Sequence, residues 1–373
     1  MPKLYRIFES FVCSLGDRLI NAKFTYSEWS SIIKKSHLYK NIAWTQEQQR
    51  RFDSFFQEHY GKRISNRLHR LYESMNGTYC HDYFPEILYT LKLEKKLNEP
   101  KYSHVLCDKS LLNVIWGNTA GVRTANEFVT CCNGITRDSD YHVVSPGRAY
   151  DILSNAGKVC IKPTVDTGSG KGLFFPVFHN GIDEKTGESV QKILRRYGRN
   201  YTVQEYIQQH DTFSALHPSS LNTIRLITYI VNEAICHVPL AARIGSGKSE
   251  VDNIHAGGIC VGVEDSGCLK SQAIRLGYGD KNEKFTEHPD THVIFGKHRL
   301  CNISQLISSA YALHAKTPQL GIISWDFTID SNGIPVLIEA NLMGQSIWFP
   351  QIVNGCSAFG DNTGAMLELI RDR

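Results

Sequence analysis

Two apolar segments near the C-terminus, both rich in β-forming residues, constrain the fold of this chain more than any other feature. They cover residues 321–329 and 334–341, and the Asp-Ser-Asn-Gly stretch at 330–333 between them is typical of a hairpin turn. We therefore predict two antiparallel strands. Glu339 and Asn341 are two positions apart, so their side chains share one face of a strand, and the turn can bring Asp326 beside them.

These three polar side chains are candidate metal ligands. Two carboxylates and one amide oxygen suit Mg²⁺, which is bound by a few carboxylates and keeps waters and substrate phosphates as further ligands. The alternative is that Asp326 and Glu339 lie on the solvent face of an ordinary hairpin. Both residues lie within hydrophobic runs, however, where an unpaired carboxylate would be costly to bury. The pattern therefore predicts a site for a metal-bound nucleotide.

Composition narrows the class of protein. With 373 residues, 42% hydrophobic and 21% charged, the chain is typical of a soluble globular protein of two or three domains. It has no membrane-spanning apolar run and no signal-peptide core, so we expect a cytoplasmic location. Eleven cysteines without a Cys-x-x-Cys pair argue against a disulfide framework and a zinc cluster.

The net charge is only +4, with a mild basic excess in the first 100 residues. Such a bias is too weak for a nucleic-acid-binding protein, so we expect no nucleic-acid partner. It could favour an anionic membrane surface or substrate, although a solvated helical face is the default explanation.

The expected secondary structure changes along the chain. Residues 1–100 read as a helical region, with helices over 6–19, 45–60 and 64–75, and residues 101–156 as a central linker with a short strand at 105–106 and a helix at 110–116. Two α+β lobes are expected to follow at 157–210 and 211–373, with an antiparallel emphasis. Their expected strands are 158–163, 173–178, 201–207, 223–232, 235–243, 257–263, 321–329 and 334–341, and their expected helices are 187–197 and 302–315.

A candidate phosphate clamp begins in the first lobe. Lys162 ends an expected strand, and a glycine-rich loop follows that contains Gly168, Ser169, Gly170 and Gly172. Glycines let backbone N–H groups close around phosphate oxygens, and a nearby lysine supplies a positive charge for the same anion. The alternative is a flexible hairpin tip.

Two further segments carry weaker signals. The strand at 201–207 has backbone groups that could read an adenine ring, with Gln204 or Glu205 near its amino group and Asp211 placed for ribose hydroxyls, although an ordinary edge strand is the default. Arg225 and Arg243 lie inside apolar strands. A guanidinium in such a place suits a bidentate anion, and a structural salt bridge is the alternative.

The order of these features resembles the ATP-grasp superfamily: Lys109, Lys162 with its glycine loop, Gln204-Glu-Tyr-Ile, Arg225, Asp326 and Glu339-Ala-Asn. More narrowly, five segments look like the sugar-transfer-associated ATP-grasp family, which is linked to cell-surface polysaccharide biosynthesis. They are Phe84-Pro-Glu-Ile-Leu, Cys107-Asp-Lys, Asn222-Thr-Ile-Arg, Val251-Asp-Asn and Gly257-Gly-Ile. The resemblance covers residues 65–370.

The resemblance implies an ATP-grasp fold in which two α+β lobes clasp ATP. Lys109 and Lys162 would contact its phosphates beneath a mobile glycine-rich lid. Residues 204–207, including Ile207, would hold adenine, and Asp211 would hold the ribose. Asp326, Glu339 and Asn341 would bind two Mg²⁺ ions, with Mn²⁺ as an alternative. One departure is Ser324, which stands where many carboxylate ligases of this superfamily have an arginine, so Arg225 or Arg243 could stabilise the intermediate instead.

The activity implied is that of an ATP-dependent carboxylate–amine ligase acting through an acyl phosphate, and we expect it to join an amino acid or amine to a sugar acid in surface polysaccharide biosynthesis. Two alternatives stay open at this point. One is an ATP-grasp kinase that phosphorylates a hydroxyl. The other is a non-catalytic nucleotide-binding accessory that associates with a glycosyltransferase or a membrane surface through its basic N-terminal region.

Overall fold

The computed structural model describes residues 2–117, 119, 121–165, 171–253, 257–275 and 283–371. Contacts divide the chain into two compact units. Unit 1 comprises Met1–Lys96 and Ser346–Arg373, and unit 2 comprises Leu97–Gln345. The α+β fold class is confirmed, with a helical N-terminal region and two largely antiparallel sheets.

Unit 1 is helical. The expected helices over 45–60 and 64–75 are confirmed as α3 and α4, and α3 begins at a capping box formed by Thr45 and Gln48. Helix α3 packs against α14 and α4 against α13, so the C-terminal segment folds with the N-terminal helices. Its helices are α1 (Pro2–Lys34), α2 (Ser36–Tyr39), α3 (Gln46–His59), α4 (Arg67–Asn76), α5 (Glu86–Leu88), the π-helix η1 (Tyr89–Leu93), α6 (Glu94–Leu97), α13 (Trp348–Asn354), the 3₁₀ turn η5 (Gly360–Asn362) and α14 (Thr363–Leu369).

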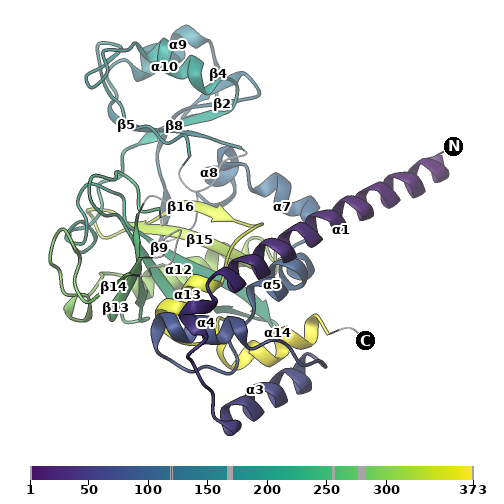
Figure 1. Ribbon diagram of the computed structural model, residues 1–373. Coiled ribbons are helices and arrows are strands. Elements are labelled where there is room, and N and C mark those ends of the chain that lie inside the picture. The colour runs from purple at the N-terminus through teal and green to yellow at the C-terminus, as the bar shows by residue number, and fades with distance from the viewer. Residues whose placement is uncertain are drawn as a thin grey trace. The chain divides into compact units, whose positions relative to one another are not determined.

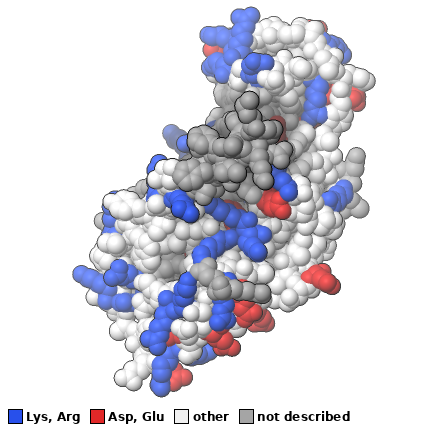
Figure 2. Space-filling view, turned by 90° about the vertical axis from the view of Figure 1, so that its right-hand side faces the viewer, with Lys and Arg blue, Asp and Glu red and all other residues white. Residues whose placement is uncertain are grey.

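Even α1, with 33 residues, does not meet the requirements for a membrane span, and neither does any other helix among the described residues. The face in Figure 2 shows lysine and arginine side chains in several separate groups, with acidic and uncharged residues between them. This distribution fits the small net charge of the sequence.

The larger sheet of unit 2 has nine strands, and it contains the expected hairpin next to the short edge strand β1. Its order is β1-β16-β15-β9-β11-β12-β13-β14, with β10 paired to β9, and among these strands only β1 and β16 pair in parallel. Helix α12 (Ile303–Ala315) packs on β9, β15 and β16 over a hydrophobic core. The strands are β1 (Arg123–Thr124), β9 (Thr223–Val231), β10 (Ala234–His237), β11 (Leu240–Ile244), β12 (Ile259–Val263), β13 (Leu269–Arg275), β14 (Glu283–Phe285), β15 (Ile322–Ile329) and β16 (Pro335–Asn341).

The smaller sheet has seven strands in the order β4-β3-β2-β8-β5-β6-β7. Three of them, β2, β3 and β4, precede residue 157 in the sequence, where the first lobe was expected to begin. Helices α9 (Pro146–Leu153) and α10 (Val190–Tyr197) cover one face (Figure 1). The strands are β2 (Glu127–Cys132), β3 (Ile135–Asp138), β4 (Val143–Val144), β5 (Gly157–Pro163), β6 (Val177–His179), β7 (Ile182–Asp183) and β8 (Tyr201–Glu205).

Several elements differ from the sequence-based expectation. The strand predicted at 105–106 is wrong, because these residues end helix α7 (Pro100–Leu106), which has proline at its first turn. The 3₁₀ turn η2 (Lys109–Leu111) and α8 (Leu112–Trp116) confirm the next helix. The segment 235–243 forms two strands that both pair with β9, and β2, β3 and β4 were not predicted.

Candidate functional site

The strand pair β15–β16 brings the three candidate metal ligands together. Asp326 lies directly opposite Glu339, and Ser324 lies opposite Asn341. A register shift follows Asp326, so that Phe327 pairs with Leu337. The Asn341 amide donates to the Asp326 carboxylate at 3.4 Å. The predicted juxtaposition of these side chains across a hairpin is therefore present, while their role as metal ligands stays a prediction.

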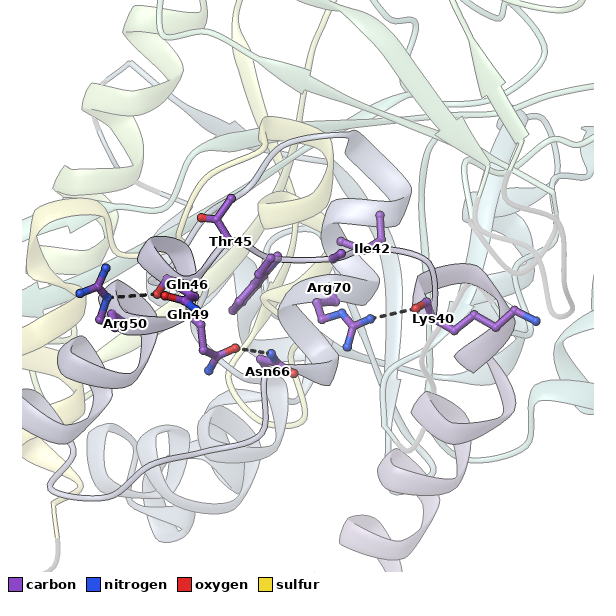
Figure 3. A pocket seen from close by; sticks show the side chains of 10 residues that line it. Lys40, Ile42, Thr45, Gln46, Gln49, Arg50, Asn66 and Arg70 are labelled. Atoms are coloured by element: carbon purple, nitrogen blue, oxygen red, sulfur yellow. Dashed lines mark hydrogen bonds between the residues drawn. The ribbon is translucent and has the colours of Figure 1, made fainter.

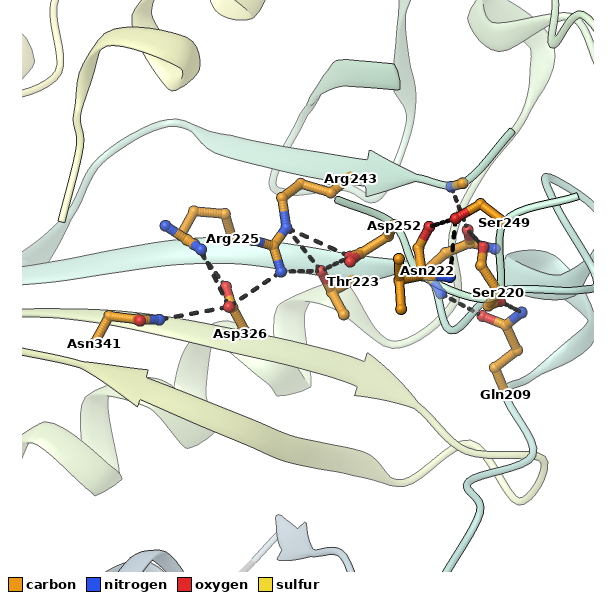
Figure 4. Close-up of polar contacts among 12 residues, drawn as sticks. Gln209, Ser220, Asn222, Thr223, Arg225, Arg243, Ser249, Asp252, Asp326 and Asn341 are labelled. Atoms are coloured by element: carbon orange, nitrogen blue, oxygen red, sulfur yellow. Dashed lines mark hydrogen bonds and ion pairs between the residues drawn. The ribbon is translucent and has the colours of Figure 1, made fainter. Parts of the chain in front are cut away.

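Asp326 is buried, and two arginines hold its carboxylate (Figure 4). Arg225, on β9, donates from Nε to Oδ1 at 2.6 Å and from Nη2 to Oδ2 at 3.1 Å. Arg243, on β11, donates from Nη2 to Oδ2 at 3.1 Å. Burial alone would raise the pKa of Asp326, but the two guanidinium groups outweigh it and hold the pKa below its usual value. Asp326 is therefore ionised and fixed in position.

Arg243 also joins this carboxylate to a second one. Its Nε lies 3.4 Å from the Asp252 carboxylate, and its Nε and Nη2 donate to Thr223 Oγ1 at 3.1 and 3.0 Å. Thr223 in turn donates to Asp252. Burial raises the pKa of Asp252 although Arg243 opposes the shift. The result is a continuous, partly buried network that runs from Asn341 to Asp252 (Figure 4).

The segment Asn222-Thr-Ile-Arg contains Arg225, and its first residue also holds the start of β9 in place. The Asn222 side-chain oxygen accepts from Gly245 N at 3.1 Å and from Ser220 Oγ at 2.9 Å, and its amide donates to the Phe213 and His217 carbonyls. These bonds tie the turn before β9 to the end of β11. Arg225 and Arg243 are thus carried by strands whose ends are locked together.

Both candidate phosphate-binding lysines lie beside the hairpin. Lys109 Nζ is 2.9 Å from Glu339 Oε1, and Lys162 Nζ donates to the Ile338 carbonyl at 3.4 Å. The backbone N–H of Lys109 donates to the Thr164 carbonyl, which fixes η2 next to the end of β5. Burial lowers the pKa of Lys162. The structure therefore gathers two lysines from separate elements around one edge of β16.

The expected adenine-binding segment is the strand β8 and the residues after it. Gln204 is buried on β8 between β2 and β5, so it belongs to an inner strand, not to a sheet edge. Glu205 ends the strand, Ile207 is buried, and Asp211 is an exposed residue at the start of α11 (Asp211–Ser214). Their contacts to a nucleotide stay predictions.

Glu205 already has partners within the chain. Its carboxylate accepts from Arg123, from the Asn126 backbone at 3.1 Å and from the Asn126 amide at 3.0 Å. Arg123 also donates to Asp330 Oδ2 at 2.9 Å, in the turn of the β15–β16 hairpin. Arg123 therefore links the end of β8 in the smaller sheet to the hairpin of the larger one.

The glycine-rich loop is only partly described. Gly168, Ser169 and Gly170 lie outside the described residues. Gly172 has a φ of +78°, and a Cβ there would lie 2.9 Å from Cγ of Pro163, so this position requires glycine. The Gly172 carbonyl accepts a hydrogen bond from Tyr197 at 2.8 Å, which ties the end of the loop to α10.

The roles of Asp252, Thr223 and Arg123 in these networks were not predicted from the sequence. Asp252 stands within the Val251-Asp-Asn segment, which was noted without a role, and a buried arginine on β11 could have indicated a second acidic partner. Arg123 is 82 positions from its partner Glu205 and 207 positions from its partner Asp330 in the chain. No local pattern predicts such pairs.

The donor set fits a hard divalent cation in part. Two carboxylates and an amide are oxygen ligands of the type that Mg²⁺ prefers. Glu339 keeps 28% of its side chain exposed and so remains reachable, whereas Asp326 keeps only 4% and shares its carboxylate with two arginines. Glu339 and Asn341 are therefore the more accessible members of the set, and Asp326 the more rigid one.

Comparison with known sequences identifies one family. The sequence model of the family described as "Sugar-transfer associated ATP-grasp" matches residues 89–365, which is well over half of the chain. The match covers the whole hairpin, both lysines and both arginines described above. No curated protein matches the sequence.

Several solved structures are similar to this chain. D-alanyl-alanine synthetase A from Vibrio cholerae matches with 10% identity and a TM-score of 0.40, over 70% of this chain and 63% of that one. N5-carboxyaminoimidazole synthetase from Staphylococcus aureus, complexed with ADP, matches with 12% identity and a TM-score of 0.36, over 73% of this chain and 52% of that one. Biotin carboxylase from Campylobacter jejuni matches with 14% identity and a TM-score of 0.39, over 71% of this chain and 46% of that one. The chain thus spans about half to three fifths of these proteins, and likeness at this level does not transfer an activity.

Proposed function

This chain belongs to the sugar-transfer-associated ATP-grasp family, and from that premise we propose that it is an ATP-dependent carboxylate–amine ligase. The observation that carries the proposal is the cluster around β16. Lys109 contacts Glu339, Lys162 contacts the neighbouring Ile338 carbonyl, and Asp326 lies opposite Glu339. Two cations, and two carboxylates that lie opposite each other on β15 and β16, match the needs of a magnesium-bound triphosphate.

The first step would activate the acid. An oxygen of the substrate carboxylate forms a bond to the γ-phosphorus of ATP, the bond from that phosphorus to the bridging oxygen breaks, and ADP leaves. Little covalent protein chemistry is needed, because positioning and charge neutralisation do most of the work in phosphoryl transfer. Lys109 and Lys162 would hold the phosphate oxygens, and the fixed backbone around them would exclude alternative orientations.

The second step would form the amide. The amine attacks the acyl carbon, the phosphate leaves, and the nitrogen loses a proton. An arginine would stabilise the tetrahedral intermediate. Arg243 is the better candidate of the two by exposure, with 18% of its side chain accessible against 10% for Arg225. Arg225 would act as a positioning residue that holds Asp326.

Bound Mg²⁺ would offset the negative charge of the triphosphate, and Asp326, Glu339 and Asn341 are the residues that would hold it. Gln204, Glu205 and Ile207 would contact adenine, with Asp211 at the ribose and the loop from Gly168 to Gly172 over the phosphates. We further propose a sugar acid and an amino acid or amine as substrates, in cytoplasmic assembly of a surface polysaccharide. The family description and the expected acid-activating chemistry support this assignment.

The decisive test is a substrate screen. Purified full-length protein is incubated with ATP, Mg²⁺ and pairs of sugar acids and amino acids, and both ADP and product mass are measured. We expect ADP with a product that has the mass of acid plus amine minus water, and a hydroxamate when hydroxylamine replaces the amine. A stable phosphorylated acceptor without hydroxamate would instead indicate a kinase. Nucleotide binding without turnover across the screen would favour the accessory alternative.

Variants connect this activity to the site. Lys162→Ala and Glu339→Gln should abolish ADP formation, because each removes a charge next to the triphosphate, while circular dichroism and thermal melting show a folded protein. Lys284→Ala, on the exposed strand β14, is the matched control and should keep full activity. Wild-type-like ADP formation by either site variant would contradict the assignment.

A further inference from the structure

Unit 1 contains a pocket whose chemistry the ligase proposal does not use. It has a volume of about 640 Å³, within the range of roughly 300–1,000 Å³ that is usual for small-molecule sites. Ten residues from the segment that runs from the end of α2 into α4 line it (Figure 3): Lys40, Ile42, Ala43, Trp44, Thr45, Gln46, Gln49, Arg50, Asn66 and Arg70. All ten belong to unit 1, whereas the site described above lies entirely in unit 2.

The lining is positively charged. It contains Lys40, Arg50 and Arg70 and no aspartate or glutamate. Among the described residues, none of these three cations forms an ion pair. Arg50 donates from Nε to the Gln46 carbonyl at 3.3 Å, and Arg70 donates from Nη2 to the Tyr39 and Lys40 carbonyls at 2.9 and 3.2 Å. Both guanidinium groups therefore have their position set by backbone oxygens while their charge remains unneutralised.

The neutral part of the lining is suited to hydroxyl groups. Asn66 donates to Gln49 Oε1 at 2.8 Å, and Gln49 donates to Asp53 at 3.0 Å, so this pair of amides is ordered (Figure 3). A side-chain amide offers both donors and acceptors, which matches the vicinal hydroxyls of a sugar ring. Gln46 adds a third amide. At the start of α3 the Gln48 N–H group is already bound by Thr45 Oγ1.

Trp44 supplies an apolar surface in a fixed orientation. Its indole N–H donates to Glu73 at 2.6 Å, and its ring meets Phe52 and Tyr79 edge to face with centroids 5.3 and 5.1 Å away. The residue is half-buried, so part of it borders the pocket. A rigid aromatic surface next to amides and cations can hold the apolar face of a sugar while polar groups bind its rim.

We propose that this pocket is a binding site for an acidic saccharide, meaning a sugar ring that carries a carboxylate or a phosphate. Lys40, Arg50 and Arg70, which lie around the pocket, would attract the negative charge, and the amides and Trp44 would contact the ring. The inference does not depend on the ligase activity, because it concerns other residues in another unit.

The test is calorimetric titration of the full-length protein without ATP. The probes are glucuronate, glucose 6-phosphate, glucose and inorganic phosphate. We expect both acidic sugars to bind at least about tenfold more tightly than glucose or phosphate. Equal binding of phosphate and glucose 6-phosphate would reduce the pocket to a simple anion site and overturn the proposal, as would the absence of binding by either acidic sugar.

Variants locate the binding. Lys40→Gln combined with Arg50→Gln should weaken the acidic sugars by at least about tenfold. Arg51→Gln combined with Arg63→Gln removes the same charge from exposed positions outside the pocket and should leave affinity unchanged. Glu339→Gln, in the ligase site, should also leave it unchanged. Loss of binding in Glu339→Gln but not in the pocket variant would place the sugar in unit 2 and overturn the inference. Thermal melting of each variant confirms that it is folded.

Discussion

The two cation-rich regions of this molecule use their charges in opposite ways. In unit 2, Arg225 and Arg243 are nearly buried, with 10% and 18% of their side chains exposed, and both are bound to carboxylates. In unit 1, Lys40 and Arg50 are exposed and have no acidic partner among the described residues. Buried pairs fix geometry but make each member costly to lose, whereas exposed cations leave stability unchanged and stay available to an anion.

The largest expected effect is that of Asp326→Asn. The substitution keeps the shape of the side chain but removes the carboxylate charge that pairs with Arg225 and one of the two carboxylate charges that pair with Arg243, and both guanidinium groups are nearly buried. Breaking a buried ion pair in this way costs about 3–5 kcal/mol, so the free energy of unfolding measured with urea should fall by that amount. Asp151→Asn, on the exposed side of α9, should change it little. Equal stability of the Asp326 variant and the wild type would show that the network does not hold the sheet.

Asp330→Asn should have a smaller effect that depends on pH. Burial would raise the pKa of Asp330, but the N–H groups of Ile334 and Asn332 and the Arg123 side chain hold the pKa below its usual value. A carboxyl with a depressed pKa stabilises the fold above its unfolded pKa, and this contribution disappears as the pH falls through its folded pKa.

We therefore expect the variant to be less stable than the wild type by about 1–2 kcal/mol at neutral pH. The difference should shrink as the pH falls below about 4, where the unfolded-state carboxyl becomes protonated. Urea unfolding of both proteins over a pH series measures it. A difference that stays constant down to strongly acidic pH would mean that the charge of Asp330 contributes nothing.

The smallest expected effect is on the stability of the pocket variant. Lys40→Gln combined with Arg50→Gln should change the free energy of unfolding by less than about 0.5 kcal/mol, as is usual for exposed positions. The same urea measurement checks it. A loss as large as that of Asp326→Asn would show that these cations are structural, and the contrast between the two regions would disappear.

The hairpin of strands β15 and β16 was predictable because neighbouring residues in the sequence determine its strands and its turn. Alternation along 334–341 places Glu339 and Asn341 on one face, and the turn residues fix the pairing with Asp326, as the register confirms. Strands β2 and β3 were not predicted, because their runs are short and mixed in character. Strand β2 is ordered by pairing with β8, far along the chain, and β3 by pairing with β2. The packing of α14 on α3 depends on similarly remote contacts.

The arginines show the same limit within the site. Their position inside apolar strands predicted that each would bind an anion or form a salt bridge, and the salt-bridge alternative is present for both. The spacing of residues in the sequence could not predict the acidic partner of each arginine, since Arg225 and Asp326 are 101 residues apart. Fold class and ligand candidates were thus accessible from the sequence, and the partners of the charged groups were not.

Binding of a nonhydrolysable ATP analogue, measured by calorimetry with and without Mg²⁺, tests the central claim most directly. Mg²⁺ should strengthen binding of the analogue to the wild type and to Lys284→Ala, and this dependence on Mg²⁺ should be lost in Glu339→Gln. Tight binding that is indifferent to Mg²⁺ and to Glu339, or no binding by the wild type, would contradict this claim.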